Sequence, residues 1–278
     1  MPHYTIGDVA VGEHSIRLYR AGEGNPQPLV FLHGSGPGVT ALSNWEGAIG
    51  RLGEQFDCIA PDIVGFGHSS HPDPPPQGMT AFTALRVETL FGLLDALGLD
   101  TVDLLGNSMG GLVALEMALA RPERIRRITL LGSAGIPFPP TPDLIKLVTF
   151  YDDPSAEALE ALMRCFLYDV TAFGDIESLS RRRIELAVRP DVRRSHLATF
   201  ASIHSVDQTR LAALPQPVML VHGRDDRIIP LDVSLQLLAM LPHSDLHVLG
   251  ECGHWLQLEK PSTFDHLVAG FHGQNPGG

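Results

Sequence analysis

Residues 102–114 read VDLLGNSMGGLVA, and this stretch decides the fold. An apolar run typical of a buried strand ends at Gly106, and an apolar stretch with helical spacing follows Gly110. In a Gly-X-Ser-X-Gly turn, the small glycines permit a strained backbone that projects the serine hydroxyl above a sheet, with a helix N-terminus beneath it. The pattern predicts that Ser108 is a nucleophile on this turn. The alternative is a tight strand-to-helix turn with an incidental serine.

Strand-like and helix-like stretches alternate along most of the chain. Continuous apolar runs indicate buried strands, and apolar residues at helical spacing indicate helices. Strands are expected at 28–34, 56–62, 102–108, 127–133, 217–223 and 246–252, and helices at 81–98 and 111–120. This order predicts an α/β protein with a mostly parallel central sheet flanked by helices. Sheets of this kind carry their chemistry at the carboxyl ends of the strands.

The alternation stops between residues 136 and 205. A proline-rich turn, IPFPPTP, is followed by four helix-like stretches and no convincing strand, the clearest being 155–168 and 176–190. An insertion after a core strand is well placed to roof a pocket. The sequence therefore predicts a core formed by 1–135 and 206–278, with 136–205 as a helical lid, or cap subdomain.

A serine hydroxyl is a weak nucleophile at neutral pH, so Ser108 requires a base and an acid that orients the base. The stretches GRDDRIIP and CGHW each follow an expected strand, in the chain order Ser, Asp, His. We predict His254 as the base and Asp226 as the acid. Asp225 is the alternative acid, because the two aspartates are adjacent.

Backbone donors for a developing oxyanion are expected in HGSGPG, residues 33–38, where the strand PLVFL ends. The N–H groups of Ser35 and Met109 would form this oxyanion hole. The alternative is a glycine-rich turn without a catalytic task. GSGPG lacks the lysine of a phosphate-binding loop.

Composition limits the remaining classes of function. The 278 residues carry a formal net charge of −12, which leaves no broad basic surface for nucleic acid. His68 and His71 lie three residues apart, but no paired cysteines or H-E-x-x-H motif supports a metal site, and no metal or other cofactor is expected. Three cysteines without a CxxC pair, a polar N-terminus and no long apolar run predict a soluble cytoplasmic protein that does not enter a membrane.

Taken together, these motifs resemble the α/β-hydrolase superfamily and, within it, the meta-cleavage product hydrolases of aromatic catabolism. The resemblance spans nearly the whole chain and includes HGSGPG, Ser43-Asn44-Trp45, PDIVGFGHS, GNSMGG, GRDDRIIP and CGHW in order and spacing. Asn107, directly before the nucleophile, is more specific to that group than the serine, because many esterases of the fold carry another residue there.

The resemblance implies hydrolysis of a carbon–carbon bond in a small molecule, a 2-hydroxy-6-oxohexa-2,4-dienoate. The dienol is first ketonised, and attack by the serine then yields 2-hydroxypenta-2,4-dienoate and a carboxylic acid. The substrate-binding residues implied are Gly34, Asn44, Asn107, Arg183 and Trp255. Arg183 would grip the substrate carboxylate in two-point fashion, with a slip by one position to Arg182 as the alternative. A homodimer or higher homo-oligomer is also implied.

Other functions fit the same residues. A carboxylesterase, a lactonase or a cofactor-free perhydrolase would use the same triad without needing Arg183. Epoxide hydrolases and haloalkane dehalogenases require an acid at the position of Ser108. A non-catalytic binding protein on this fold would usually have lost a triad member. The substituent at C6 of the substrate is not determined by the sequence.

Overall fold

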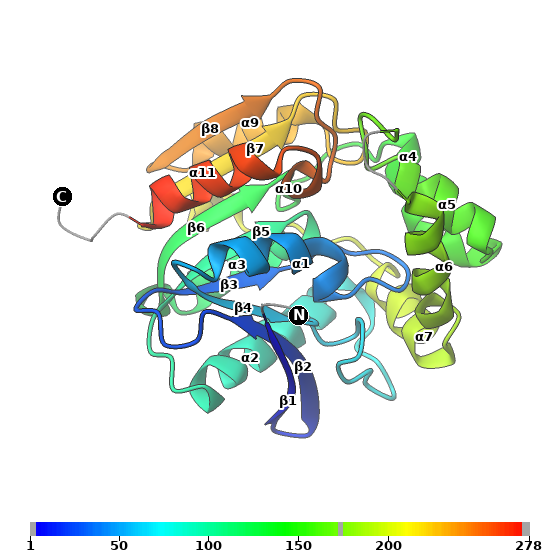
Figure 1. Ribbon diagram of the computed structural model, residues 1–278, viewed down its shortest axis with the longest axis horizontal. Helices are drawn as coiled ribbons and strands as arrows, with labels where there is room; N and C mark the ends of the chain where they lie inside the picture. Colours follow the sequence, from blue (N-terminus) through cyan, green and yellow to red (C-terminus); the bar gives the residue numbers. More distant parts are fainter. Residues whose placement is uncertain (1–3, 172–174, 274–278) are drawn as a thin grey trace.

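The computed structural model describes residues 4–171 and 175–273. Eight strands form one sheet in the order β1-β2-β4-β3-β5-β6-β7-β8 (Figure 1). The strands are β1 (Thr5–Val11), β2 (His14–Ala21), β3 (Pro28–Leu32), β4 (Asp57–Pro61), β5 (Val102–Asn107), β6 (Ile125–Leu131), β7 (Val218–Gly223) and β8 (Ser244–Leu249). Neighbouring strands from β4 to β8 pair in parallel, whereas β2 pairs antiparallel with both β1 and β4. The predicted α/β-hydrolase fold is confirmed.

Helices cover both faces of the sheet. They are α1 (Ala41–Leu52), α2 (Gly78–Ala96), α3 (Met109–Ala120), α4 (Pro142–Val148), α5 (Ala156–Arg164), α6 (Ile176–Ala187), α7 (Pro190–Thr199), α8 (Gln208–Leu211), α9 (Leu231–Met240), α10 (Leu256–Glu259) and α11 (Pro261–His272), with short 3₁₀ turns at Pro122–Arg124 and Phe150–Asp152. Residues of α2, α3 and α9 pack on one face, and residues of α1 and α11 pack on the other. Strand β3 shows the pattern, because Val30 and Leu32 join the first cluster while Leu29 and Phe31 join the second. Burial on both faces explains the continuous apolar runs of β3 to β7.

The N-terminal hairpin of β1 and β2 was not predicted. Strand β1 carries Thr5, Gly7 and Asp8, and most of its residues are exposed. An edge strand of this kind lacks the continuous apolar run by which the other strands were recognised.

Between β6 and β7, helices α4 to α7 lie together to one side of the sheet (Figure 1). Proline at the first position of α4 and of α7 sets their N-terminal boundaries. The helices fall within the predicted insertion 136–205, of which residues 172–174 lie outside the described residues. The division of the chain into core and cap remains a prediction. No helix in the described part of the chain has both the length and the apolar character needed to cross a bilayer.

Candidate active site

Ser108 occupies the turn between β5 and α3 with φ 57 and ψ −120, a left-handed backbone that is costly for a residue with a Cβ atom. A Cβ on Gly106 would lie 2.5 Å from the carbonyl oxygen of Gly110, and a Cβ on Gly110 would lie 2.1 Å from that of Leu32. The Ser108 N–H donates to the Leu131 carbonyl at 3.0 Å. Close backbone contacts therefore exclude a side chain at Gly106 and at Gly110. The hydrogen bond to Leu131, the last residue of β6, anchors the turn to the neighbouring strand.

Asp226 follows β7 with its side chain buried. Its Oδ1 accepts hydrogen bonds from the N–H groups of Ile228 at 2.8 Å and Ile229 at 3.0 Å. Its Oδ2 lies 2.7 Å from Nδ1 of His254. Asp225 is partly exposed and pairs instead with the neighbouring arginine. The structure thus places Asp226 rather than Asp225 beside the histidine, in an orientation fixed by two backbone donors.

The three predicted catalytic residues follow β5, β7 and β8, and their neighbourhoods are joined by contacts of Asn107 and Gly132. Asn107 Nδ2, next to Ser108, donates to the backbone carbonyl of His254 at 3.4 Å. A Cβ on Gly132, at the end of β6, would lie 2.9 Å from Asp226 Oδ2 and 3.2 Å from His254 Nδ1. Because Nδ1–H donates to the carboxylate, Nε2 is the acceptor nitrogen of the neutral ring. The ring is therefore in the tautomer that a base for a serine proton requires.

A second histidine, His222, lies against the same carboxylate. Its Nε2 is 3.5 Å from Asp226 Oδ2 and 3.0 Å from the carbonyl oxygen of Ile229, and its Nδ1 is 2.7 Å from Ser234 Oγ. Burial lowers the pKa of His222, so the ring is neutral at pH 7, with Nε2–H donating to Ile229 and Nδ1 accepting from Ser234. A neutral ring leaves His254 as the group whose positive charge Asp226 would stabilise. Sequence reasoning assigned His222 no role.

The loop after β3 brings backbone donors next to the nucleophile. His33 is buried, and burial lowers its pKa to about 4. Its Nδ1–H donates to the Gly34 carbonyl at 2.7 Å, and its Nε2 accepts from the Ile63 N–H at 3.0 Å, which fixes the loop. The Ser35 N–H makes no hydrogen bond with the described residues, and Met109 opens α3, where N–H groups have no partner within the helix. Two free donors therefore flank the Ser108 turn.

Arg183 reaches the same loop from α6. Its side chain is buried, Nη2 donates to the Pro37 carbonyl at 3.0 Å, and its guanidinium carbon lies 6.0 Å from the Trp255 ring centre. No carboxylate within the described ranges pairs with it, and burial lowers its pKa to about 10. Arg181 and Arg182 are exposed, and each contacts a residue one turn earlier on α6. The structure thus buries Arg183 and leaves Arg182 at the surface.

Two glycines of HGSGPG make this approach possible. A Cβ on Gly36 would lie 3.0 Å from Nη2 of Arg183. A Cβ on Gly38, where φ is 64, would lie 2.2 Å from the Arg183 carbonyl oxygen. The glycine-rich loop therefore has a packing task, the docking of α6, as well as its predicted role beside the nucleophile.

Among the buried amide oxygens that lack partners within the described ranges, two belong to predicted substrate-binding residues: Oδ1 of Asn44 and Oδ1 of Asn107. A Cβ on Gly34 would lie 3.2 Å from Oδ1 of Asn107 and 3.2 Å from the Ser108 Cβ. A buried acceptor without a donor is costly, so these oxygens are suited to a ligand that brings its own donor. The absence of a side chain at position 34 therefore keeps the approach to Asn107 Oδ1 and to Ser108 open.

Sequence reasoning also missed Arg86, a fully buried residue of α2. Its Nε donates to the Val64 carbonyl at 3.2 Å, Nη2 donates to Thr199 Oγ1 at 2.8 Å, and Nη1 lies 3.5 Å from Met109 Sδ. Burial lowers its pKa to about 9. Its apolar sequence neighbours gave no signal, because its contacts come from segments distant in the chain.

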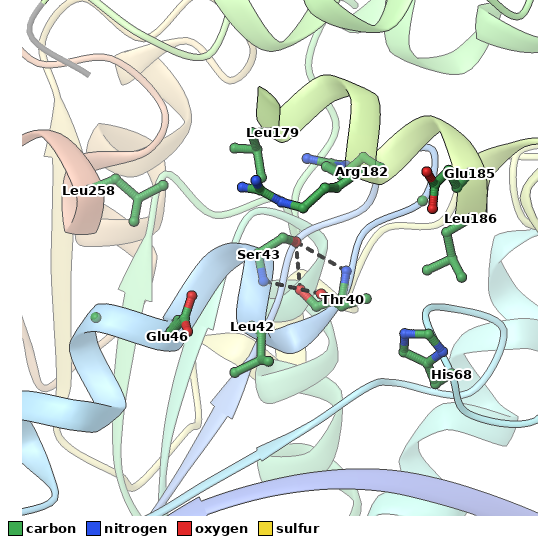
Figure 2. A pocket seen from close by; sticks show the side chains of 13 residues that line it. Thr40, Leu42, Ser43, Glu46, His68, Leu179, Arg182, Glu185, Leu186 and Leu258 are labelled. Carbon is green, nitrogen blue, oxygen red and sulfur yellow. Dashed lines mark hydrogen bonds between the residues drawn. The ribbon is translucent and has the colours of Figure 1, made fainter. Parts of the chain in front are cut away.

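A cleft of about 740 Å³ opens between α1 and α6 (Figure 2). Thr40 and Ser43 cap the start of α1 on one side of the cleft, with Leu179 and Arg182 of α6 opposite them (Figure 2). Arg183 contributes to its lining, whereas the three predicted catalytic residues do not. The cleft therefore borders the site on the side of Arg183.

No group of three or more metal-ligating side chains comes together anywhere in residues 4–171 and 175–273. His71 instead lies 3.0 Å from a serine hydroxyl of α7 through its Nδ1. The expectation that the protein needs no metal remains a prediction.

The chain matches a known protein family and several solved structures. Residues 29–265 match the family described as "Alpha/beta hydrolase family". The 2-hydroxymuconate semialdehyde hydrolase of Pseudomonas sp. (strain CF600) is 38% identical over 88% of this chain and 86% of that protein. The solved structure of 2-hydroxy-6-oxo-6-phenylhexa-2,4-dienoate hydrolase from Rhodococcus sp. strain RHA1 matches with a TM-score of 0.94 at 36% identity, over 98% of this chain and 99% of that one. A meta-cleavage product hydrolase from Pseudomonas fluorescens IP01 matches with a TM-score of 0.88 at 31% identity, over 96% and 98%.

The fold and the nucleophile turn define a hydrolase of the α/β type. More narrowly, the chain belongs to the meta-cleavage product hydrolases of the alpha/beta hydrolase family. The predicted class of enzyme, a serine hydrolase acting on carbon–carbon bonds, is confirmed.

Proposed function

We propose that the chain hydrolyses the C5–C6 bond of a 2-hydroxy-6-oxohexa-2,4-dienoate, with Ser108, Asp226 and His254 as its catalytic triad. The observation that carries this proposal is Arg183, a buried guanidinium without a carboxylate partner among the described residues, located beside the oxyanion loop and Trp255. A simple ester has no group that requires such a cation. The C1 carboxylate of a dienoate would satisfy it with charge-assisted hydrogen bonds.

The remaining polar groups fit the rest of the same substrate. The 2-hydroxyl of the dienol would donate its one proton to an unpartnered Oδ1 atom, that of Asn44 or that of Asn107. Trp255, against the guanidinium, would cover the planar dienoate. With the carboxylate end held at Arg183, the 6-oxo group extends toward Ser108 and the N–H donors of the oxyanion hole.

The reaction proceeds in two parts. The substrate first ketonises: the proton of its 2-hydroxyl is transferred, through His254 or its hydrogen-bond network, to the dienolate carbon C5. Ser108 then adds to C6, His254 takes the serine proton, and the N–H groups of Ser35 and Met109 stabilise the oxyanion. The C5–C6 bond breaks with its electron pair moving into the five-carbon fragment. The 2-oxygen of this fragment takes the proton from His254, which becomes neutral again, and the fragment is released as 2-hydroxypenta-2,4-dienoate. Water, activated by His254, hydrolyses the acyl-enzyme to the carboxylic acid.

Three further properties belong to the same proposal. Residues 136–205 would act as a cap that carries Arg183 over the site. Cys58, Cys165 and Cys252 are free and buried, which supports function in a reducing cytoplasm. A homodimer or larger homo-oligomer remains a prediction, which light scattering of the purified protein would test.

The test is a panel of yellow meta-cleavage products with hydrogen, methyl or phenyl at C6, followed by loss of visible absorbance, beside hydrolysis of p-nitrophenyl acetate. We expect rapid bleaching of at least one dienoate and slow turnover of the ester. Inert dienoates with brisk ester turnover would instead indicate a carboxylesterase. The ranking of the three dienoates identifies the preferred substituent at C6.

A further inference from the structure

Behind the catalytic histidine, residues 166–169 of the predicted cap cross the loop formed by residues 252–255. The Phe166 carbonyl accepts hydrogen bonds from the N–H groups of His254 at 2.8 Å and Trp255 at 3.3 Å. The Phe166 ring stacks on both side chains, with ring centres 5.6 Å from that of His254 and 4.7 Å from that of Trp255. The backbone and the ring of His254 are therefore both in contact with the cap segment.

Glu259, the last residue of α10, joins these two segments through a single carboxylate. Its Oε1 accepts from the Gly253 N–H at 2.8 Å, and its Oε2 accepts from the Tyr168 N–H at 2.8 Å. Burial raises the pKa of Glu259, while hydrogen bonds from Tyr168 and Gly253 act in the opposite direction. The carboxylate is thus partly desolvated, and both of its oxygens are committed to backbone donors.

The packing at Gly253 shows how closely the segments meet. A Cβ there would lie 2.6 Å from the Phe166 carbonyl oxygen and 3.0 Å from Glu259 Oε1. The glycine before the catalytic histidine is therefore required by the cap contact. Neither segment can shift without breaking hydrogen bonds to the other.

We propose that Glu259 is a positioning residue that fixes His254 by clamping its loop to the cap. An ionised carboxylate has acceptor capacity on both oxygens, as two backbone donors on different segments require. A glutamine in the same place turns one acceptor into an N–H group facing a backbone N–H. A displacement of the base by a fraction of an ångström would then slow each proton transfer in which it takes part. This inference rests on the proposed role of His254 as the base.

The clamp acts through the base, so its loss should affect every substrate that depends on the base. For Glu259→Gln, we expect kcat for the dienoate and for p-nitrophenyl acetate to fall together by about tenfold, or about 1.4 kcal/mol. KM for both substrates should change less than about twofold, because Glu259 contacts neither substrate. Hydrogen–deuterium exchange should rise in peptides covering 166–169 and 252–255, and not in β7.

Glu116→Gln is the matched control. Glu116 is a partly buried glutamate of α3 whose Oε1 lies 2.7 Å from Nε2 of His204, about two turns from Met109. Glu116→Gln should lower the melting temperature about as much as Glu259→Gln does, and it should leave kcat unchanged. Should Glu259→Gln not fold, Glu259→Asp, which keeps the charge and shortens the reach, replaces it with the same expected loss of kcat.

A folded Glu259 variant with wild-type kcat would overturn the proposal, as would a loss of kcat equal to that of Glu116→Gln or a change confined to KM. A separate variant, His254→Ala, distinguishes the two levels of the argument. If His254→Ala keeps full activity, the assignment of the base is wrong. If it is inactive while Glu259→Gln is fully active, only the clamp is wrong.

Discussion

Replacing Arg183 by methionine separates what the guanidinium does for the substrate from what it does to stability. Burial lowers the pKa of Arg183 from the usual arginine value of about 12.5 to about 10. This difference corresponds to about 3 kcal/mol by which burial disfavours the charged side chain. Because the pKa is lower in the folded state, the penalty is present in full below about pH 10 and disappears as the pH rises toward about 12.5.

Methionine occupies a similar volume without a charge. We therefore expect the free energy of unfolding of Arg183→Met at pH 7 to be unchanged or to rise by up to about 3 kcal/mol, less the lost hydrogen bond to the Pro37 carbonyl. In Arg183→Met, the carboxylate of a bound dienoate has no cation to pair with. Removing one partner of such a buried charge pair costs about 2–5 kcal/mol of binding free energy. The value of kcat/KM for the dienoate should then fall by roughly 30- to 5,000-fold. Hydrolysis of p-nitrophenyl acetate should change less than about twofold, because this ester carries no carboxylate.

The assay follows dienoate bleaching and ester hydrolysis at pH 7 together with urea unfolding of the same preparations. Arg182→Met, one residue away and exposed, is the control and should leave all three measurements near the wild-type values. An equal loss on both substrates would refute a specific contact with the carboxylate. A large drop in the free energy of unfolding would show that Arg183 is a structural cross-link.

Four other substitutions test different parts of the structure. Ser108→Ala should still bind the dienoate or ketonise it, with the accompanying colour change, while losing C–C cleavage; stopped-flow absorbance checks this, and full cleavage would mean that Ser108 is not the nucleophile. His196→Phe removes a buried histidine whose pKa burial lowers to about 4. As the pH falls from about 6.5 to 4, the wild type should lose about 1.4 kcal/mol of unfolding free energy per pH unit relative to the variant, because only its unfolded state binds the proton. Urea unfolding at pH 7 and pH 5 measures this, and a pH-independent difference would contradict it. Gly110→Ala places a methyl group 2.1 Å from a carbonyl oxygen and should prevent stable folding, whereas Gly270→Ala, with nothing within 4 Å, should raise stability by about 0.5–1 kcal/mol in thermal unfolding.

The sequence predicted those parts of the site that depend on local chain geometry. Ser108 and His254 each follow a strand that the sequence indicated, and a parallel sheet brings such positions to one edge. The choice between Asp225 and Asp226 could not be made in this way, because both belong to the same turn. It depends on which carboxylate faces the backbone donors of Ile228 and Ile229, and this is a property of the folded loop.

Two of the residues that sequence reasoning missed, Arg86 and Glu259, have partners that lie far away along the chain. Arg86 contacts Thr199 of α7, and Glu259 contacts Tyr168. Such contacts arise when the helical segment packs on the core, and no periodicity in the chain reports which residues will meet. The hairpin of β1 and β2 was missed for a different reason, since an exposed edge strand has no apolar pattern.

Two arginines, Arg86 and Arg183, are buried in the described part of the chain, and neither pairs with a carboxylate there. The sequence has 32 acidic residues against 20 lysines and arginines. Within the described ranges, however, Arg183 donates to a carbonyl oxygen, and Arg86 contacts uncharged groups. An apolar residue would relieve the desolvation penalty at either position. The retention of a buried guanidinium at position 183, beside the predicted oxyanion loop, is therefore best explained by a ligand that brings the negative charge, which is what an anionic dienoate would do and a neutral ester would not.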